Sequence, residues 1–173
     1  IEQHPADSWT DRPLQERCIT YGMPYLLAGY NSYYQIVQSR DHVAIIQEMI
    51  HDVRVIPLVD KPHVDARVRL WHGDSRGYWD GETLVIETKN FSDASELLGS
   101  GGNRFFTEKF TRTAVDNLQY EFTIEDTETW ATPWTAIINY SGSPDPIFEY
   151  ACHEGNYGLF GILSGHRAQE RTL

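Results

Sequence analysis

A histidine and a glutamate stand side by side where the sequence predicts that its last strand ends. His153 and Glu154 precede Gly155 and Asn156, so the chain is expected to leave the sheet through a turn. Loops of this kind often carry functional groups, and histidine is the side chain best suited to move protons near neutral pH. Glu154 could orient the imidazole or act as its partner acid or base. The alternative is a plain turn in which Asn156 caps the tail and Glu154 is solvated.

The run Gly73–Gly77 holds a second set of polar groups between two glycines. Glycine allows a close approach of the backbone to a ligand, and the Arg76 guanidinium offers a planar fork of donors for a carboxylate or for sugar hydroxyls. Asp74 could act as a base or hold Arg76 in place. No Lys-Ser/Thr pair follows, so the run is not a phosphate-binding loop. It also fits a connecting turn closed by an Asp–Arg salt bridge.

The third candidate is a set of histidines, namely His51, His63, His72 and His153. If His51, His63 and His153 converge, they could bind zinc or another divalent metal, with Glu154 or Asp52 as an oxygen ligand. Their spacing matches no known ligand signature, and no Cys-x-x-Cys pair is present. The expected cofactor is therefore none, with a divalent metal as the alternative. Each histidine taken alone fits a surface or hydrogen-bonded residue.

Aromatic side chains are the fourth candidate, because flat rings stack on sugars and line apolar cavities. We expect Tyr34, Trp71 and Trp79 to contribute to a substrate-binding wall. Most of the other rings fit an ordinary core. A Gly-x-Ser-x-Gly motif is absent, which argues against a serine hydrolase. The full aromatic set comprises Tyr30, Tyr33, Tyr34, Trp71, Tyr78, Trp79, Trp130 and Trp134.

The composition excludes several classes of protein. The 173 residues include 25 acidic and 14 basic ones, giving a net charge of −11, so binding to nucleic acid or to anionic membranes is not expected. No apolar run approaches the roughly 20 residues of a membrane span. Hydrophobic residues make up 40%, enough for one folded domain over residues 1–173. No signal peptide is visible, and a first residue other than Met is consistent with a mature or trimmed form.

Short strands separated by turns dominate the pattern. The clearest is 118–125, in which apolar and polar residues alternate as a half-buried strand requires. Asp80-Gly81 between two strands favours a type I′ hairpin. Residues 1–32 are irregular, with one helical turn capped by Asp11, and residues 154–173 form a tail with a helical turn capped by Asn156. The expected strands are 33–38, 42–49, 53–58, 64–71, 78–80, 83–88, 105–112, 118–125, 134–140 and 147–152.

Many consecutive antiparallel strands need their edges closed. We therefore expect an all-β fold with little helix, in which residues 33–153 form an antiparallel up-and-down barrel that encloses a small ligand. A two-sheet β-sandwich is the alternative.

Several runs resemble a widespread family of exported bacterial proteins, most of them uncharacterised. The resemblance implies a bacterial, periplasmic or extracellular protein, and it implies no activity. The Trp-x-Gly-x-Thr-Leu pattern is also similar to calycin or lipocalin-like barrels, a likeness of fold alone. The runs that carry the family resemblance are 34–38, 48–52, 73–77, 79–84 and 150–157.

An exported chain with two cysteines usually pairs them, so the resemblance favours a disulfide between Cys18 and Cys152. It would join the irregular N-terminal segment to the end of the last strand. The alternative is two separate buried thiols.

We expect an exported enzyme that performs acid–base chemistry, of lyase, hydratase or isomerase type, on an oxygenated small molecule such as a sugar derivative or an aromatic compound. His153 would be the general acid or base, with Glu154, Asp52 or Asp74 as a further catalytic group and Arg76 as the substrate anchor. The alternative is a non-catalytic module that binds a small ligand or a carbohydrate. A binding module needs a mainly apolar pocket, whereas an enzyme needs ionisable groups that converge in it.

Overall fold

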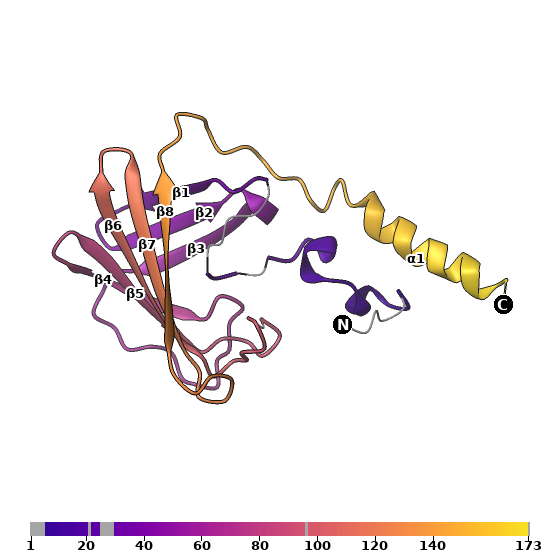
Figure 1. Ribbon diagram of the computed structural model, residues 1–173, viewed down its shortest axis with the longest axis horizontal. Coiled ribbons are helices and arrows are strands. Elements are labelled where there is room, and N and C mark those ends of the chain that lie inside the picture. Colours follow the sequence, from indigo (N-terminus) through magenta and orange to yellow (C-terminus); the bar gives the residue numbers. More distant parts are fainter. Residues whose placement is uncertain (1–5, 21, 25–29, 96, 173) are drawn as a thin grey trace.

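Eight antiparallel strands form two sheets. The computed structural model describes residues 6–20, 22–24, 30–95 and 97–172. A three-stranded sheet has the order β1-β2-β3, and a five-stranded sheet has the order β4-β5-β6-β7-β8 (Figure 1). The strands are β1 (Tyr34–Gln38), β2 (His42–Gln47), β3 (Asp52–Pro57), β4 (Asp74–Asp80), β5 (Thr83–Lys89), β6 (Phe105–Ala114), β7 (Asn117–Glu125) and β8 (Trp134–Ser141).

The two sheets share one hydrophobic core. Along β7 the side chains of Tyr120, Phe122 and Ile124 are buried, which confirms the alternation expected for this strand. They belong to the same cluster as Val43 and Ile45 of β2, so the apolar faces of the two sheets pack together. This burial of alternate residues is the main stabilising contribution to the fold.

The prediction of a mostly β fold is confirmed, with the strands in two sheets. The described strands do not form one closed barrel. No ladder joins the two sheets among the described residues. At the edge between β1 and β8, Tyr34 and Tyr140 meet through their rings, 5.7 Å between centroids. Side-chain packing thus takes the place that backbone hydrogen bonds would occupy in a closed barrel.

Two of the expected strands are wrong. Residues 64–71 form a loop whose only bridge is a single parallel pairing of Leu70 with Phe91. The carboxylate of Asp65 accepts a hydrogen bond from the backbone N–H of Arg67, and this local bond competes with the hydrogen bonds of a strand ladder. Residues 147–152 are also not a strand. After β8 the chain leaves the sheet, and Cys152 lies in the terminal segment, where it pairs with Cys18.

The Gly73–Gly77 run is mostly strand rather than turn, because β4 begins at Asp74. The hairpin that follows has the two-residue loop Gly81-Glu82, since Asp80 pairs with Thr83. Of the two loop residues, Gly81 has a positive φ of 61° and Glu82 does not. A positive φ at the first loop position alone fits a type II′ turn, so the expected type I′ turn is wrong.

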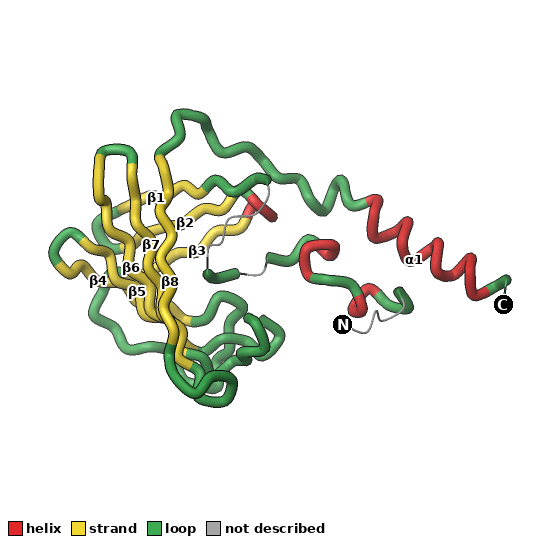
Figure 2. Tube along the Cα trace, viewed as in Figure 1, coloured by secondary structure: helices red, strands yellow, loops and turns green. Residues whose placement is uncertain are grey.

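The described segments near the two ends of the chain lie side by side, beyond the sheets (Figures 1 and 2). We call residues 7–20 and 150–170 the terminal arm. It contains the 3₁₀ turns η1 (Trp9–Asp11) and η2 (Leu14–Arg17) and the helix α1 (Tyr157–Glu170). Asn156 caps α1 as expected, but the helix has 14 residues instead of one turn. The helical turn expected after Asp11 is η2, but its N-cap position is Pro13 and no side chain caps it. Asp11 instead ends η1 and completes the capping box of Ser8.

The disulfide between Cys18 and Cys152 is present, with 5.7 Å between the Cα atoms, so the predicted pairing is confirmed. Asn156 reinforces this link by donating a hydrogen bond to the carbonyl of Glu16 at 2.7 Å. Arg167 of α1 binds Asp7 at 2.8 Å. Within the described residues, no helix is both long and apolar enough to cross a bilayer.

Candidate functional site

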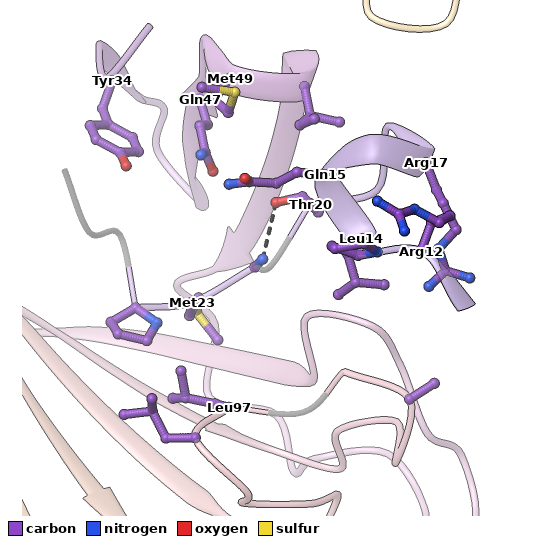
Figure 3. Close-up of a pocket in the computed structure, with 16 residues that line it drawn as sticks. Arg12, Leu14, Gln15, Arg17, Thr20, Met23, Tyr34, Gln47, Met49 and Leu97 are labelled. Atoms are coloured by element: carbon purple, nitrogen blue, oxygen red, sulfur yellow. Dashed lines mark hydrogen bonds between the residues drawn. The ribbon is translucent and has the colours of Figure 1, made fainter. Parts of the chain in front are cut away.

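A cavity of about 630 Å³ lies between the terminal arm and the sheets, and we call it the arm cavity (Figure 3). Figure 3 shows Gln15 of the arm extending toward Gln47 and Met49 on the sheet side. The described residues that line it are Arg12, Pro13, Leu14, Gln15, Arg17, Thr20, Gly22, Met23, Pro24, Tyr34, Gln47, Met49, Ile50, Ala94, Leu97 and Leu98.

The lining of the arm cavity combines apolar side chains with neutral hydrogen-bonding groups. No carboxylate and no imidazole line it among the described residues. Burial raises the pKa of the Tyr34 hydroxyl to about 12, so this hydroxyl keeps its proton well above neutral pH. The charged groups on the lining are two guanidinium groups, those of Arg12 and Arg17.

One wall of the cavity depends on an unusual turn. The short turn η3 (Met49–His51) connects β2 to β3, and its residues Ile50 and His51 have positive φ values of 64° and 56°. Such a φ is strained for a β-branched residue, so the surrounding structure must hold it. The turn buries Met49 and places Ile50 on the lining.

A histidine–aspartate pair lies directly behind another part of the wall. His72 Nε2 is 2.7 Å from Asp52 Oδ2. Burial favours a higher pKa for Asp52, but hydrogen bonds from His72, Val53 and Thr20 and the charge of His72 bring it below the usual value. The other ring nitrogen of His72, Nδ1, is buried and has no hydrogen-bond partner. A Cβ atom at Gly22 would lie 3.1 Å from it, so Gly22 separates it from the cavity.

Trp71 supports the same wall. Its indole Nε1 donates a hydrogen bond to the carbonyl of Thr20 at 2.9 Å. Trp71 therefore holds the lining residue Thr20 in place and does not itself line the cavity among the described residues.

Farther into the core, an ion pair connects the two sheets. Arg54 Nη2 of β3 lies 2.6 Å from Glu108 Oε2 of β6, and both side chains are almost completely buried. Tyr120 donates a hydrogen bond to the other carboxylate oxygen at 3.0 Å. Burial raises the pKa of Glu108, and Arg54 and Tyr120 oppose this only in part.

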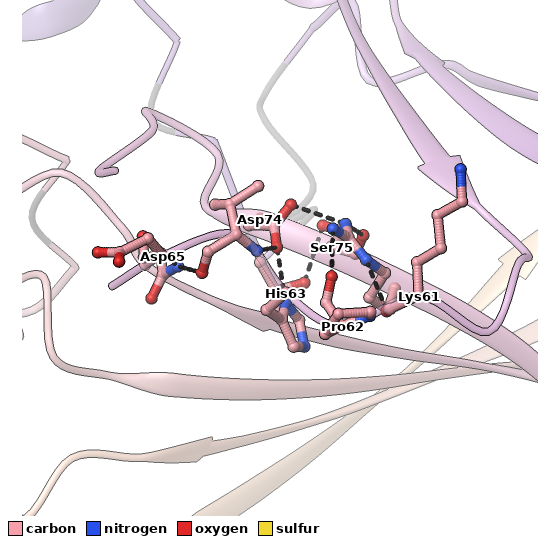
Figure 4. Close-up of polar contacts among 10 residues, drawn as sticks. Lys61, Pro62, His63, Asp65, Asp74 and Ser75 are labelled. Atoms are coloured by element: carbon pink, nitrogen blue, oxygen red, sulfur yellow. Dashed lines mark hydrogen bonds and ion pairs between the residues drawn. The ribbon is translucent and has the colours of Figure 1, made fainter. Parts of the chain in front are cut away.

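Asp74 and Arg76 form an ion pair that also hydrogen-bonds the loop before β4, residues 61–64 (Figure 4). Asp74 Oδ2 accepts hydrogen bonds from the backbone N–H of Val64 and contacts His63 Nδ1 at 2.8 Å, while its Oδ1 binds Arg76 at 2.7 Å. Arg76 also donates to the carbonyls of Lys61 and Pro62. Burial favours a higher pKa for Asp74, but these hydrogen bonds lower it. Both groups are thus engaged within the chain, as in the salt-bridged alternative.

The remaining predicted residues are dispersed. His153 and Glu154 are exposed on the terminal arm, and Trp79 is exposed on β4. The three expected metal ligands do not come together: His51 is exposed in η3, His63 contacts Asp74, and His153 is on the arm. Among the described residues, the only group close enough to hold a metal is Asp7, His166 and Glu170. Arg167 already binds both carboxylates of that group.

The structure also brings in residues that the sequence reasoning missed. Arg12, Gln15 and Arg17 lie in a segment without strand or helix periodicity, so no pattern selected them. The one usable signal was the position of Arg17 next to Cys18. The pairing of His72 with Asp52 had no signal in the spacing.

A second cavity of about 610 Å³ opens at the edge between β1 and β8. Ile36 and Ile45 line it from one sheet, and Phe110 and Tyr140 line it from the other. Val115, which is exposed, lies at this cavity as well.

No model of a known protein family, no curated protein and no solved structure matches this chain.

Proposed function

We propose that the protein binds a small, largely apolar molecule in the arm cavity. The observation that carries this proposal is the lining: a cavity of about 630 Å³ in which apolar side chains predominate and hydrogen-bonding groups are interspersed. Small-molecule sites usually have this size and this balance of surfaces. The ionisable residues expected to form an active site are dispersed or engaged elsewhere, so the non-catalytic alternative is the better supported one.

The proposal can be tested with N-phenyl-1-naphthylamine, a neutral aromatic probe whose fluorescence rises in apolar surroundings. We expect saturable binding to the native protein. Ala94 lines the arm cavity with an exposed, small side chain, so Ala94→Trp should fill part of it and weaken binding about tenfold or more.

Val115→Trp is the matched control, because it places the same side chain at the second cavity. It should leave probe binding unchanged. If Val115→Trp removes binding and Ala94→Trp does not, the ligand site is between the sheets and the proposal for the arm cavity is wrong.

An acid–base enzyme is the second candidate function, and the His72–Asp52 pair favours it. Asp52 would hold the imidazole so that the unpartnered Nδ1 acts as the base, provided that the segment around Gly22 moves aside. Phenylpyruvate tests this, since a general base exchanges its benzylic protons for deuterium in D₂O. Exchange above the buffer rate that disappears in His72→Gln would support an enzyme. An unchanged rate would argue against it.

We also propose that the chain belongs to the exported family that it resembles. The disulfide supports an oxidising compartment such as the periplasm or the extracellular space, because such bonds are rare in the cytosol. Fractionation of the source cells tests this placement: recovery of the protein with reduced thiols in the cytosol would contradict it.

A further inference from the structure

We infer that the ligand of the arm cavity carries a negative charge at one end, and that Arg17 binds this charge. The inference rests on the proposed function and names the chemical class of the ligand. It starts from the charge distribution: the chain has a net charge of −11, yet the described lining contains two arginines and no acidic residue.

The two arginines are not equivalent. Arg12 already has a counter-charge, because Glu16 binds its guanidinium through two hydrogen bonds of 2.8 and 3.0 Å. Arg17 forms no ion pair with any described residue, and its guanidinium lies over the ring of Trp9, 5.4 Å from the ring centroid. Arg17 Nε is buried and has no hydrogen-bond partner.

Arg17 lines the cavity without a counter-charge among the described residues, so an anion bound at its guanidinium would form a new ion pair without breaking an existing one. Arginine is well suited to the task, since its planar group binds a carboxylate or sulfonate through two parallel hydrogen bonds. The stacking on Trp9 would hold the guanidinium in one orientation. Arg17 is therefore available for an anionic group that enters the cavity, and Arg12 is not.

The position of Arg17 is also fixed by covalent structure. Arg17 ends η2 and directly precedes Cys18, which the disulfide ties to Cys152. The neighbouring carbonyl of Glu16 accepts a hydrogen bond from Asn156. This end of the cavity is thus held in place before any ligand binds, and a pre-organised site reduces the entropy lost on binding.

Much of the lining away from Arg17 is apolar (Figure 3). Met23, Met49 and Leu97 contribute long, adaptable or branched apolar side chains to the lining. The ligand class that fits both ends is a small amphipathic anion: an aromatic or alkyl body that bears one carboxylate or sulfonate.

Two dyes that differ by one sulfonate test the inference: 8-anilinonaphthalene-1-sulfonate and its neutral parent, N-phenyl-1-naphthylamine. We expect Arg17→Gln to weaken binding of the sulfonate dye about tenfold, the effect of one charge-assisted hydrogen-bonded contact, and to change binding of the neutral dye less than about twofold. Arg17→Lys keeps the charge and should retain most of the affinity for the sulfonate. Arg40→Gln removes the same charge from a side chain that is 95% exposed, and should have no effect on either dye.

The outcomes separate the two proposals. If Ala94→Trp blocks the neutral dye but Arg17→Gln leaves the sulfonate dye unaffected, the cavity binds ligands and the anion site is refuted. If Arg40→Gln weakens the sulfonate dye as much as Arg17→Gln does, the effect is general electrostatics and the anion site is again refuted. If Ala94→Trp affects neither dye, the proposed function itself fails. If Arg17→Gln does not fold, Arg17→Lys takes its place in the test. The inference is overturned if a folded Arg17→Lys protein binds the neutral dye normally but binds the sulfonate dye weakly.

Discussion

Replacing Arg54 by methionine should destabilise the protein, and the loss should grow as the pH rises. The change leaves Glu108, whose side chain is fully buried, without its cation and with the Tyr120 hydroxyl as a remaining donor. Removing one partner of a buried ion pair typically costs about 3–5 kcal/mol. That is a large part of the roughly 5–15 kcal/mol that stabilises a typical domain.

The pH dependence follows from the raised pKa of Glu108. A carboxyl group with a raised pKa in the folded state contributes full stability below its ordinary pKa of about 4.3, and this contribution is lost as the pH rises through the folded pKa. Without Arg54 the folded pKa rises further. At pH values where the free energy of unfolding of the wild type no longer changes, that of the variant therefore still falls by about 1.4 kcal/mol per pH unit. The difference between the two proteins should be smallest near the ordinary carboxyl pKa of about 4.3 and should grow as the pH rises above it.

Urea unfolding across this pH range measures the effect. Trp134 reports on the core, because its ring packs edge-on against Phe122 at 5.8 Å. Lys109→Met is the matched control: Lys109 adjoins Glu108 in sequence, but its pair with Glu121 is half-exposed, so we expect a loss of about 0–1 kcal/mol. Arg54→Met combined with Glu108→Gln should remove the pH-dependent part. A difference between Arg54→Met and wild type that stays constant with pH would refute the reasoning.

Three further predictions concern the disulfide, a glycine and the aspartate behind the cavity. Replacing Cys18 and Cys152 by serine should lower the unfolding free energy by up to about 5 kcal/mol, the chain-entropy value for the 134-residue separation, and thermal unfolding measures it; two free thiols in the denatured, unreduced wild type would contradict the bond. Gly73→Ala should cost about 3 kcal/mol or more in urea unfolding, because φ is +66° and the new Cβ would lie 2.7 Å from a methyl group of β5. Gly81→Ala, with φ +61° and open space, should cost about 1 kcal/mol, and equal losses at both glycines would rule out the clash. Asp52 has a lowered pKa, so its stabilisation is present above the ordinary pKa of about 3.9 and is lost as the pH falls through the folded pKa; the destabilisation by Asp52→Asn should therefore shrink in acid, and a constant difference from wild type would argue against it.

Local patterns in the sequence were enough for the features that depend on near neighbours. The alternation in 118–125 predicted the buried face of β7, because side chains of a strand point to opposite faces in turn. Asn156 was recognised as a helix cap, since capping involves residues only three positions apart. The disulfide was predicted for a different reason: the family resemblance implies an exported chain, and two cysteines allow a single intramolecular pair. The all-β class follows from the same local evidence.

Tertiary structure decided what depends on distant residues. Whether the sheet closes depends on how β1 meets β8, and these strands are about a hundred residues apart. The sequence predicts His153 at the end of a strand, but the last strand ends at Ser141, and His153 is exposed beside the Cys18–Cys152 bond. The arm cavity arises where a segment without any periodicity lies beside the sheets: the disulfide ties this segment to residues 150–170, and Trp71 bonds the carbonyl of Thr20. Burial and pairing of single side chains are set by packing in three dimensions, and no pattern along the chain encodes them.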